Sequence, residues 1–176
     1  SSTSDSSGNT GDASGEESNP QDTANGVTAA VIADAKPEFT VNSEAVYMVN
    51  TDTESDIKVY AKNENERRAP ASLTKIMTAI VVLENMGSLK DVVTVPGYIY
   101  DEFYGIGVSN AGIVRGEEIT VEDLLYALML RSACEAASIL ADYISPDNIQ
   151  GFVDLMNQKA KSLGCTGTHF MNAHGL

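Results

Sequence analysis

A serine and a lysine stand three residues apart at the start of a predicted helix. At this spacing Ser72 and Lys75 share one helical face and can touch each other. A serine hydroxyl is a weak nucleophile that needs a base, and a lysine amine can accept its proton when burial favours the neutral amine. The pair therefore suits nucleophilic attack by Ser72 with Lys75 as the general base, and the helix N-terminus would favour the developing negative charge.

Taken alone, the pair also has an ordinary interpretation. Serine is a common helix N-cap, and lysine is usually a solvated surface residue. Many unrelated helices carry these two residues at this spacing by chance. The surrounding segments therefore decide whether the pair is catalytic.

Hydrophobic periodicity predicts the elements that would position the pair. Two β-prone runs, 45–49 and 57–61, predict an antiparallel hairpin. Residues 92–95 predict another short strand. A helix is predicted to end at Gly87. Its buried face is predicted to carry Leu73, Ile76, Met77, Ile80 and Leu83.

Three more helices are expected after an irregular segment that covers residues 98–115. Thr120 suits the N-cap of the first, with acidic residues in the first turn. The pattern breaks near 131–132, resumes, and stops at Pro146. The last helix is predicted over about 149–163 and closed by Gly164, with its inward face formed by Phe152, Met156, Ala160 and Leu163.

Composition separates a tail from a domain. Residues 1–36 are mostly small and polar, which predicts a disordered linker, and residues 37–176 carry the apolar periodicity of a folded domain. The net charge of −14 comes without a basic stripe, so a nucleic-acid partner is excluded. No apolar run reaches transmembrane length.

Cysteine and histidine give no sign of a metal site. Cys134 and Cys165 could form one disulfide, but their spacing does not establish it. His169 and His174 lie near Cys165 without a recognised zinc spacing. We expect no metal and no cofactor, and we expect His174 to hydrogen-bond the backbone or to cap a turn.

The segments around Ser72 resemble those of one enzyme family. Residues 67–79 (RRAPASLTKIMTA) closely resemble the nucleophile segment of the D-alanyl-D-alanine carboxypeptidases, the low-molecular-mass penicillin-binding proteins. Collinear similarity extends over residues 37–176 and includes 116–128 (GEEITVEDLLYAL), 152–157 (FVDLMN) and 168–176 (THFMNAHGL). The resemblance implies that Ser72 is the nucleophile and Lys75 its base.

The family's second motif, Ser-x-Asn, aligns with residues 132–134. Ser132 matches it, which implies a hydroxyl across the cleft from Lys75 that helps to relay a proton to the leaving group. Cys134 stands where the family usually has asparagine, and a thiol is a much weaker hydrogen-bonding group than an amide. Two interpretations of Cys134 stay open: a substrate-binding position with altered rate and preference, or a small buried packing residue.

The family's third motif, Lys-Thr-Gly, does not occur after Ser132. In the family this motif supplies the strand that lines the cleft, an oxyanion N–H and a cation for the substrate carboxylate. The resemblance implies an α/β (α+β) fold of the β-lactamase and transpeptidase type, with an antiparallel sheet flanked by helices and a mostly helical subdomain. We expect this chain to hold only the first strands and the helical part, and to be inactive alone.

Three functions follow from these motifs. The resemblance favours a serine-type D-Ala-D-Ala carboxypeptidase that acts on peptidoglycan stem peptides through an acyl-enzyme and is inhibited by β-lactams. The alternative is an impaired pseudoenzyme that binds or senses peptidoglycan, which Cys134 and the absent third motif suggest. A class A β-lactamase is disfavoured because no Glu-x-x-Leu-Asn segment follows Ser132.

The location of the protein is an expectation from composition and family resemblance. A polar low-complexity stretch at a chain that starts with Ser1 favours a processed, exported protein. The resemblance implies the extracytoplasmic face of the bacterial membrane or the cell wall. Any membrane attachment would come through an anchor or tether outside this sequence.

Overall fold

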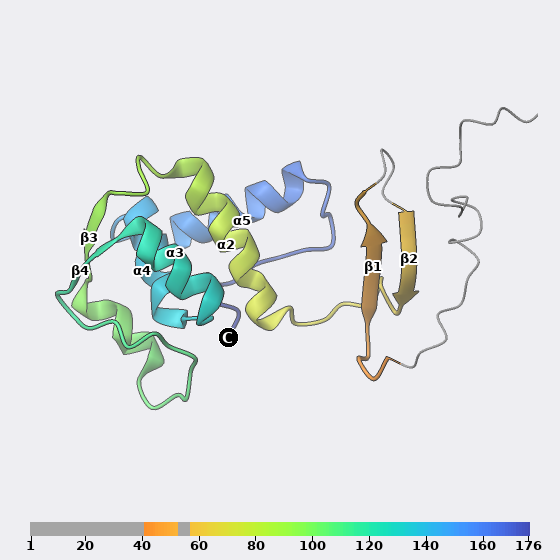
Figure 1. Ribbon diagram of the computed structural model, residues 1–176, viewed down its shortest axis with the longest axis horizontal. Helices are drawn as coiled ribbons and strands as arrows, with labels where there is room; N and C mark the ends of the chain where they lie inside the picture. Colours follow the sequence, from red (N-terminus) through yellow and green to blue (C-terminus); the bar gives the residue numbers. More distant parts are fainter. Residues whose placement is uncertain (1–40, 53–56) are drawn as a thin grey trace, which may run out of the picture. The chain divides into compact units, whose positions relative to one another are not determined.

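The computed structural model describes residues 41–52 and 57–176. The chain divides after Glu66 into two compact units (Figure 1). The predicted linker over residues 1–36 lies outside the described residues. The prediction of one domain over 37–176 stays a prediction.

The first unit contains a β-hairpin, as the sequence predicted. β1 (Val46–Asn50) pairs antiparallel with β2 (Ile57–Lys62), and the register shifts between Met48 and Val49. The amine of Lys62 donates hydrogen bonds to the carbonyls of Val41 and Ser43, at 3.2 and 2.9 Å. These bonds tie the end of β2 to the segment that precedes β1.

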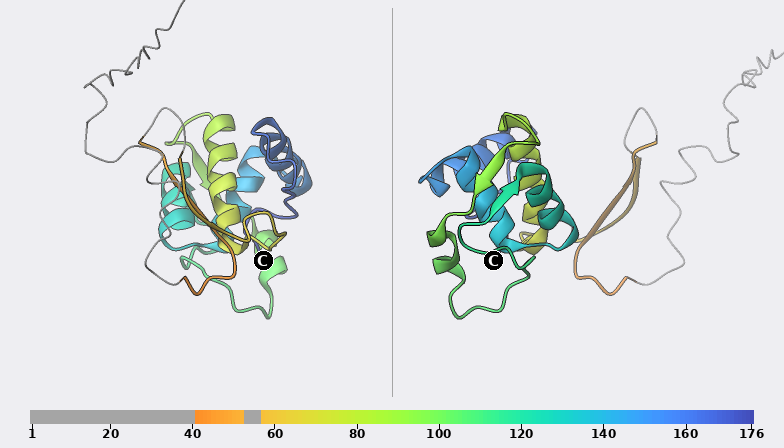
Figure 2. Two further views of the ribbon diagram at one scale, coloured as in Figure 1. Left: turned by 90° about the vertical axis from the view of Figure 1, so that its right-hand side faces the viewer. Right: turned by 60° about the vertical axis from the view of Figure 1, so that its left-hand side comes forward.

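The second unit is a group of α-helices around α2 (Thr74–Asn85), which packs against the three helices that follow it (Figure 2). These are α3 (Val121–Leu130), α4 (Cys134–Ile144) and α5 (Ile149–Ser162). Short 3-10 helices lie before α2 and between the strands, namely η1 (Ala71–Leu73) and η2 (Gly97–Phe103). None of the helices in the described ranges is long and apolar enough to span a membrane.

A small sheet closes one end of this unit. β3 (Val92–Thr94) was predicted, but its antiparallel partner β4 (Glu118–Thr120) was not. β4 has only three residues and runs directly into the N-cap of α3, so the capping signal masked the strand. The β3–β4 pairing brings together the two ends of the intervening segment, which contains η2 and the loop beside the candidate site.

The core of the second unit is mostly aliphatic and includes the rings of Phe152 and Phe170. Its largest fully buried side chains come from all four helices. They are Phe152, Leu124, Leu128, Ile139, Leu140, Met156, Val81, Val82 and Val121. The four helices therefore share one core, which fixes their mutual positions.

The predicted inward face of α2 is wrong. Leu73 just before the helix is 68% exposed, and Ile76 and Leu83 are about half exposed. The buried face carries Lys75 and Thr78 with Val82, so it mixes polar and apolar residues. Apolar residues occur on both sides of this helix, and periodicity could not reveal that two polar side chains find buried partners.

Helix ends were predicted with mixed success. Thr120 caps α3 by accepting a hydrogen bond from the Asp123 N–H, and Gly164 adopts a left-handed backbone after α5, both as expected. Gly87 does not end α2, because the helix stops at Asn85 and Met86 is already extended. Leu163 is 55% exposed and does not form part of the inward face of α5.

Candidate active site

The start of α2 presents Ser72 and Lys75 to each other. Ser72 lies in η1, which leads directly into α2, and Lys75 lies in the first turn of that helix. The Lys75 amine is 3.2 Å from the Ser72 hydroxyl oxygen. This distance is short enough for direct proton transfer from a nucleophile to its base.

The amine of Lys75 is held from its other side by the backbone. Only 3% of Lys75 is exposed, and its Nζ donates a 2.9 Å hydrogen bond to the carbonyl of His174. Its partners among the described residues are thus a hydroxyl and a carbonyl, rather than a carboxylate. The backbone therefore fixes the amine beside the Ser72 hydroxyl.

Ser132 completes a chain of three polar groups. Its hydroxyl donates a 3.0 Å hydrogen bond to the Ser72 hydroxyl oxygen. Ser132 lies in the turn between α3 and α4 with φ +52, a left-handed conformation that costs a non-glycine residue about 1–2 kcal/mol. The turn is held by Ser109, whose hydroxyl donates to the Ser132 carbonyl at 2.6 Å. The structure therefore brings Ser72, Lys75 and Ser132 together, and their catalytic roles stay predictions.

An open cavity of about 410 Å³ lies over these groups. Its walls come from the η1 turn, the start of α2, the end of α3 and the turn that follows α3. The lining residues are Pro70, Ala71, Ser72, Leu73, Lys75, Leu128, Met129 and Ser132. The cavity is large enough for the end of a peptide to approach the Ser72 hydroxyl.

Cys134 lies beside this chain of groups but is buried. Only 1% of the residue is exposed, and its sulfur is 3.7 Å from the Ser109 hydroxyl oxygen and 4.0 Å from the Ser132 carbonyl oxygen. Its backbone N–H donates to the Ser109 carbonyl at 2.9 Å. Cys134 thus packs the turn that carries Ser132, and its contact with substrate stays a prediction. Cys134 and Cys165 are both free thiols.

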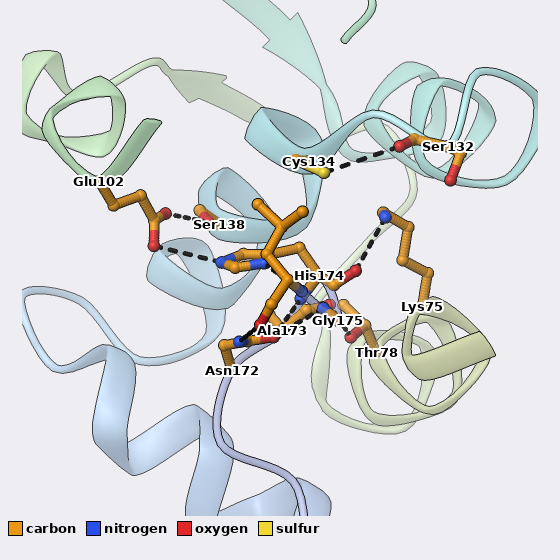
Figure 3. A network of polar contacts seen from close by, with 11 residues as sticks. Lys75, Thr78, Glu102, Ser132, Cys134, Ser138, Asn172, Ala173, His174 and Gly175 are labelled. Carbon is orange, nitrogen blue, oxygen red and sulfur yellow. Dashed lines mark hydrogen bonds and ion pairs between the residues drawn. The ribbon is translucent and has the colours of Figure 1, made fainter. Parts of the chain in front are cut away.

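A polar network supports the carbonyl that holds Lys75 (Figure 3). The ring of His174 lies with Nε2 3.2 Å from Glu102, and Glu102 also accepts a hydrogen bond from Ser138. The hydroxyl of Thr78 donates to the Ala173 carbonyl at 2.6 Å. The 173–174 backbone is therefore fixed on two sides, and the His174 carbonyl is fixed with it.

Sequence reasoning missed most of this network. We expected His174 to bond the backbone, and its Nδ1 does accept from the Leu176 N–H at 3.2 Å. The contact of its ring with Glu102 was not expected, because Glu102 falls in a segment predicted to be irregular. No local pattern marks a pair that lies 72 residues apart.

Gly175 lies against the nucleophile turn. Its φ is +85, and a Cβ built at this position would lie 1.9 Å from the Ala71 carbonyl oxygen and 2.9 Å from the Thr74 hydroxyl oxygen. Only glycine permits both this conformation and this approach. The backbone that holds Lys75 and the turn that holds Ser72 are thus packed in direct contact.

We expect the Glu102 carboxylate to make the stability of this network acid-sensitive. Partial burial acts to raise the pKa of Glu102, but hydrogen bonds from His174 and Ser138 and the attraction of His174 lower it below the usual 4.5. Because the pKa of Glu102 is lower in the folded protein than in the unfolded protein, its ionised carboxylate stabilises the fold at pH values above the pKa of the unfolded state. This contribution is lost as the pH falls through the pKa of the folded state.

Denaturant titrations of Glu102→Gln and the parent protein from pH 7 down to pH about 3 test this expectation. The difference in free energy of unfolding between the two proteins should shrink as the pH falls. A Glu102→Gln difference that stays level over this pH range would contradict the expectation.

Within the described residues, no group of three or more histidine, cysteine, aspartate or glutamate side chains is arranged to hold a metal ion. The arrangement around Ser72 offers a hydroxyl nucleophile, an amine and a second hydroxyl. Acyl transfer is the chemistry that such groups perform together.

Comparison with known proteins identifies relatives over most of the chain. The family model of D-alanyl-D-alanine carboxypeptidases, peptidase family S11, matches residues 30–176. D-alanyl-D-alanine carboxypeptidase DacF of Bacillus subtilis is 34% identical over 143 residues, which cover 81% of this chain and 36% of that protein. A D-alanyl-D-alanine carboxypeptidase of Streptomyces sp. strain K15 is 35% identical over 159 residues, which cover 87% of this chain and 54% of that protein. The chain thus spans between about a third and about half of the length of these relatives.

Solved structures agree with the sequence comparison. The crystal structure of the Streptomyces K15 DD-transpeptidase has a TM-score of 0.69 and 35% identity, and the match covers 78% of this chain and 55% of that one. The carboxypeptidase DacD from Francisella tularensis has a TM-score of 0.66 and 34% identity, with 78% of this chain and 33% of that one covered. Solved variants of the K15 enzyme replace a serine by alanine and a cysteine by asparagine two positions apart, which is the spacing of Ser132 and Cys134.

Proposed function

Because this chain belongs to the D-alanyl-D-alanine carboxypeptidase family, with the fold of the DD-peptidases, we propose that it carries the nucleophile half of a serine D-Ala-D-Ala carboxypeptidase site. The substrate is the D-Ala-D-Ala end of a peptidoglycan stem peptide. The observation that carries the proposal is the position of the Ser72 hydroxyl, 3.2 Å from the Lys75 amine and 3.0 Å from the Ser132 hydroxyl. A nucleophile with a base on one side and a proton relay on the other is equipped for acyl transfer.

In the first step the Ser72 oxygen attacks the carbonyl carbon of the penultimate D-alanine while the Ser72 proton passes to the Lys75 amine. Ser72 lies in η1 just before α2, which places the developing negative charge near the positive end of the helix dipole. The His174 carbonyl, 2.9 Å from the amine, holds Lys75 on the nucleophile through this transfer.

In the second step the peptide C–N bond breaks and free D-alanine leaves. Its nitrogen takes a proton from Lys75 through the Ser132 hydroxyl, and the peptide remains as an ester on Ser72. Water then adds to the ester carbon, the Ser72 oxygen recovers a proton, and the shortened peptide departs. A β-lactam would acylate Ser72 in the same first step, because its ring amide opens as the D-Ala-D-Ala amide breaks.

Cys134 is compatible with this activity. The K15 enzyme, named a DD-transpeptidase, carries a serine and a cysteine at the spacing of Ser132 and Cys134. This likeness argues against Cys134 as a mark of a pseudoenzyme. We propose that Cys134 packs against the turn that carries Ser132. Because the thiol is buried, it could contact substrate only if this turn opened.

We further propose that the protein works at the extracytoplasmic face of the membrane or in the cell wall, where its substrate occurs. The polar residues at the start of the sequence would then act as a spacer between an anchor and the enzyme. Cell fractionation combined with protease treatment of intact cells tests this location. Recovery in the envelope fraction with cleavage by added protease would support it, and confinement to the cytoplasm would overturn it.

Release of D-alanine tests the proposed reaction. We expect the full-length protein to remove the terminal alanine from diacetyl-L-Lys-D-Ala-D-Ala and not from the matched peptide that ends in L-alanine. The readout is liquid chromatography with mass spectrometry, which detects the shortened peptide from either substrate. Binding of the peptide without release of D-alanine would contradict the proposal and would favour a pseudoenzyme.

A further inference from the structure

A buried carboxylate outside the catalytic groups has one oxygen without a partner. Glu135 lies in the first turn of α4 and is 3% exposed. Its Oε1 accepts a 2.6 Å hydrogen bond from the Ala111 N–H, which holds the 108–113 loop against the helix. Its Oε2 is buried and, within the part of the chain that the structure describes, has no hydrogen-bond partner. A buried carboxylate oxygen without a partner is unfavourable, so we expect Oε2 to accept a hydrogen bond from a bound molecule.

A cavity of about 260 Å³ adjoins Glu135. Its walls include the rings of Tyr100 and Phe103, the apolar side chains of Ile106 and Val108, and Asn110. Its volume is several times the volume of one water molecule in the liquid, about 30 Å³. The lining thus combines a single carboxylate with two aromatic rings, a combination that attracts organic cations.

The cationic side chain that lies over the Tyr100 ring, Arg115, is paired with another carboxylate. The Arg115 guanidinium lies 5.5 Å from the centre of the Tyr100 ring and pairs with Asp101 at 3.3 Å. The ion pairs found within the described ranges do not include Glu135. The Tyr100 hydroxyl is also committed, because it donates to the Ile113 carbonyl at 2.6 Å. The donor for Glu135 Oε2 must therefore come from outside these side chains.

The charge of Glu135 already influences this wall of the cavity. Burial raises the pKa of the Tyr100 hydroxyl, and the negative charges of Glu135 and Glu117 raise it further, against the opposing effect of Arg115. The net charge of −14 adds a general attraction for cations. Both effects favour a positively charged occupant over an anion.

We propose that this cavity binds a primary ammonium group, with Glu135 Oε2 as its anionic acceptor and the Tyr100 and Phe103 rings beside its alkyl stem. One unpartnered carboxylate oxygen suits a compact ammonium better than a guanidinium, which uses two oxygens in parallel. The described residues offer no second carboxylate here, so the set does not suit a divalent metal ion. The site needs no chemistry from Ser72 and stands independently of the proposed peptidase activity.

One loop connects the wall of this cavity with the turn that carries Ser132. Ser109 bonds the Ser132 carbonyl at 2.6 Å, and two residues later Ala111 bonds Glu135. An occupant of the cavity would therefore contact the loop whose other end supports Ser132.

NMR titration of the isotope-labelled protein with n-butylammonium chloride tests the proposal. We expect saturable shifts of the Ala111 and Ile113 amide signals in the parent protein. n-Butanol, which has the same stem without the charge, should produce no saturable shift. Glu135→Gln keeps an oxygen for the Ala111 N–H but loses the charge, and it should weaken butylammonium binding by about tenfold or more.

Controls separate the proposal from its competitors. Glu118→Gln removes an exposed carboxylate that does not line the cavity and should leave the affinity unchanged. A titration with Nα-acetyl-L-lysine amide distinguishes the two sources of the ammonium group. Binding tighter than that of butylammonium favours a lysine side chain of a peptide, and weaker binding favours a free amine. Absence of saturable shifts in the parent protein, which would leave an ordered water as the partner of Oε2, would overturn the proposal. Equal affinity for n-butanol, or full affinity in folded Glu135→Gln, would overturn it too.

Discussion

Replacing Lys75 with glutamine is expected to slow acylation of Ser72 by about a thousandfold, in the range that loss of a general base produces. Lys75 is the amine within 3.2 Å of the nucleophile, and glutamine cannot accept the Ser72 proton. Its amide can still donate to the His174 carbonyl, so the helix start should remain folded. Stopped-flow measurement of fluorescent penicillin binding to the full-length protein gives the rate.

Two further variants make the Lys75 test specific. Lys75→Arg keeps a long basic side chain but stays protonated, so it cannot accept the Ser72 proton, and it should be as slow as Lys75→Gln. Lys159→Gln removes a surface lysine that pairs with Glu84 and should acylate at the parent rate. Acylation of folded Lys75→Gln within about tenfold of the parent rate would contradict the assignment of Lys75 as the base.

Replacing Gly175 with alanine is expected to destabilise the second unit by about 3 kcal/mol and to disturb the site at the same time. The added Cβ would lie 1.9 Å from the Ala71 carbonyl oxygen, which forces the 172–175 segment away from the Ser72 turn. That movement would separate the His174 carbonyl from the Lys75 amine. We expect both a lower free energy of unfolding in urea and slower acylation of the folded variant.

Gly164→Ala is the matched control for this substitution. Gly164 has φ +77, close to the +85 of Gly175, but no atom lies within 4 Å of a Cβ added there. It should therefore cost only the backbone conformation, about 1 kcal/mol, and leave acylation unchanged. Equal losses of stability in the two variants, with normal acylation in both, would show that the close approach of Gly175 to Ala71 is unimportant.

Features that depend on neighbouring residues in the sequence could be predicted. Ser72 and Lys75 face each other because three residues make almost one helical turn. The hairpin strands and the Thr120 cap likewise depend on patterns of a few residues. The resemblance around these motifs added the family, which the four residues of Ser-x-x-Lys could not establish alone.

Features that depend on distant residues could not be predicted. The carbonyl that holds Lys75 lies 99 residues further along the chain, and a backbone carbonyl carries no residue-type signal at all. Glu102 and His174 meet only after η2 and the 172–176 segment have packed around α4. The buried face of α2 was misassigned for the same reason, because Lys75 and Thr78 are buried by partners that only the folded chain supplies.

The central claim is that Ser72 is the nucleophile of this chain, set between Lys75 and Ser132. Peptide mapping by mass spectrometry after treatment of the full-length protein with benzylpenicillin tests it most directly. We predict one penicilloyl adduct, on the peptide that contains Ser72, which disappears in Ser72→Ala and persists at a slower rate of formation in Ser132→Ala. An adduct on Ser132 or another residue, or no adduct in the folded parent protein, would contradict the account.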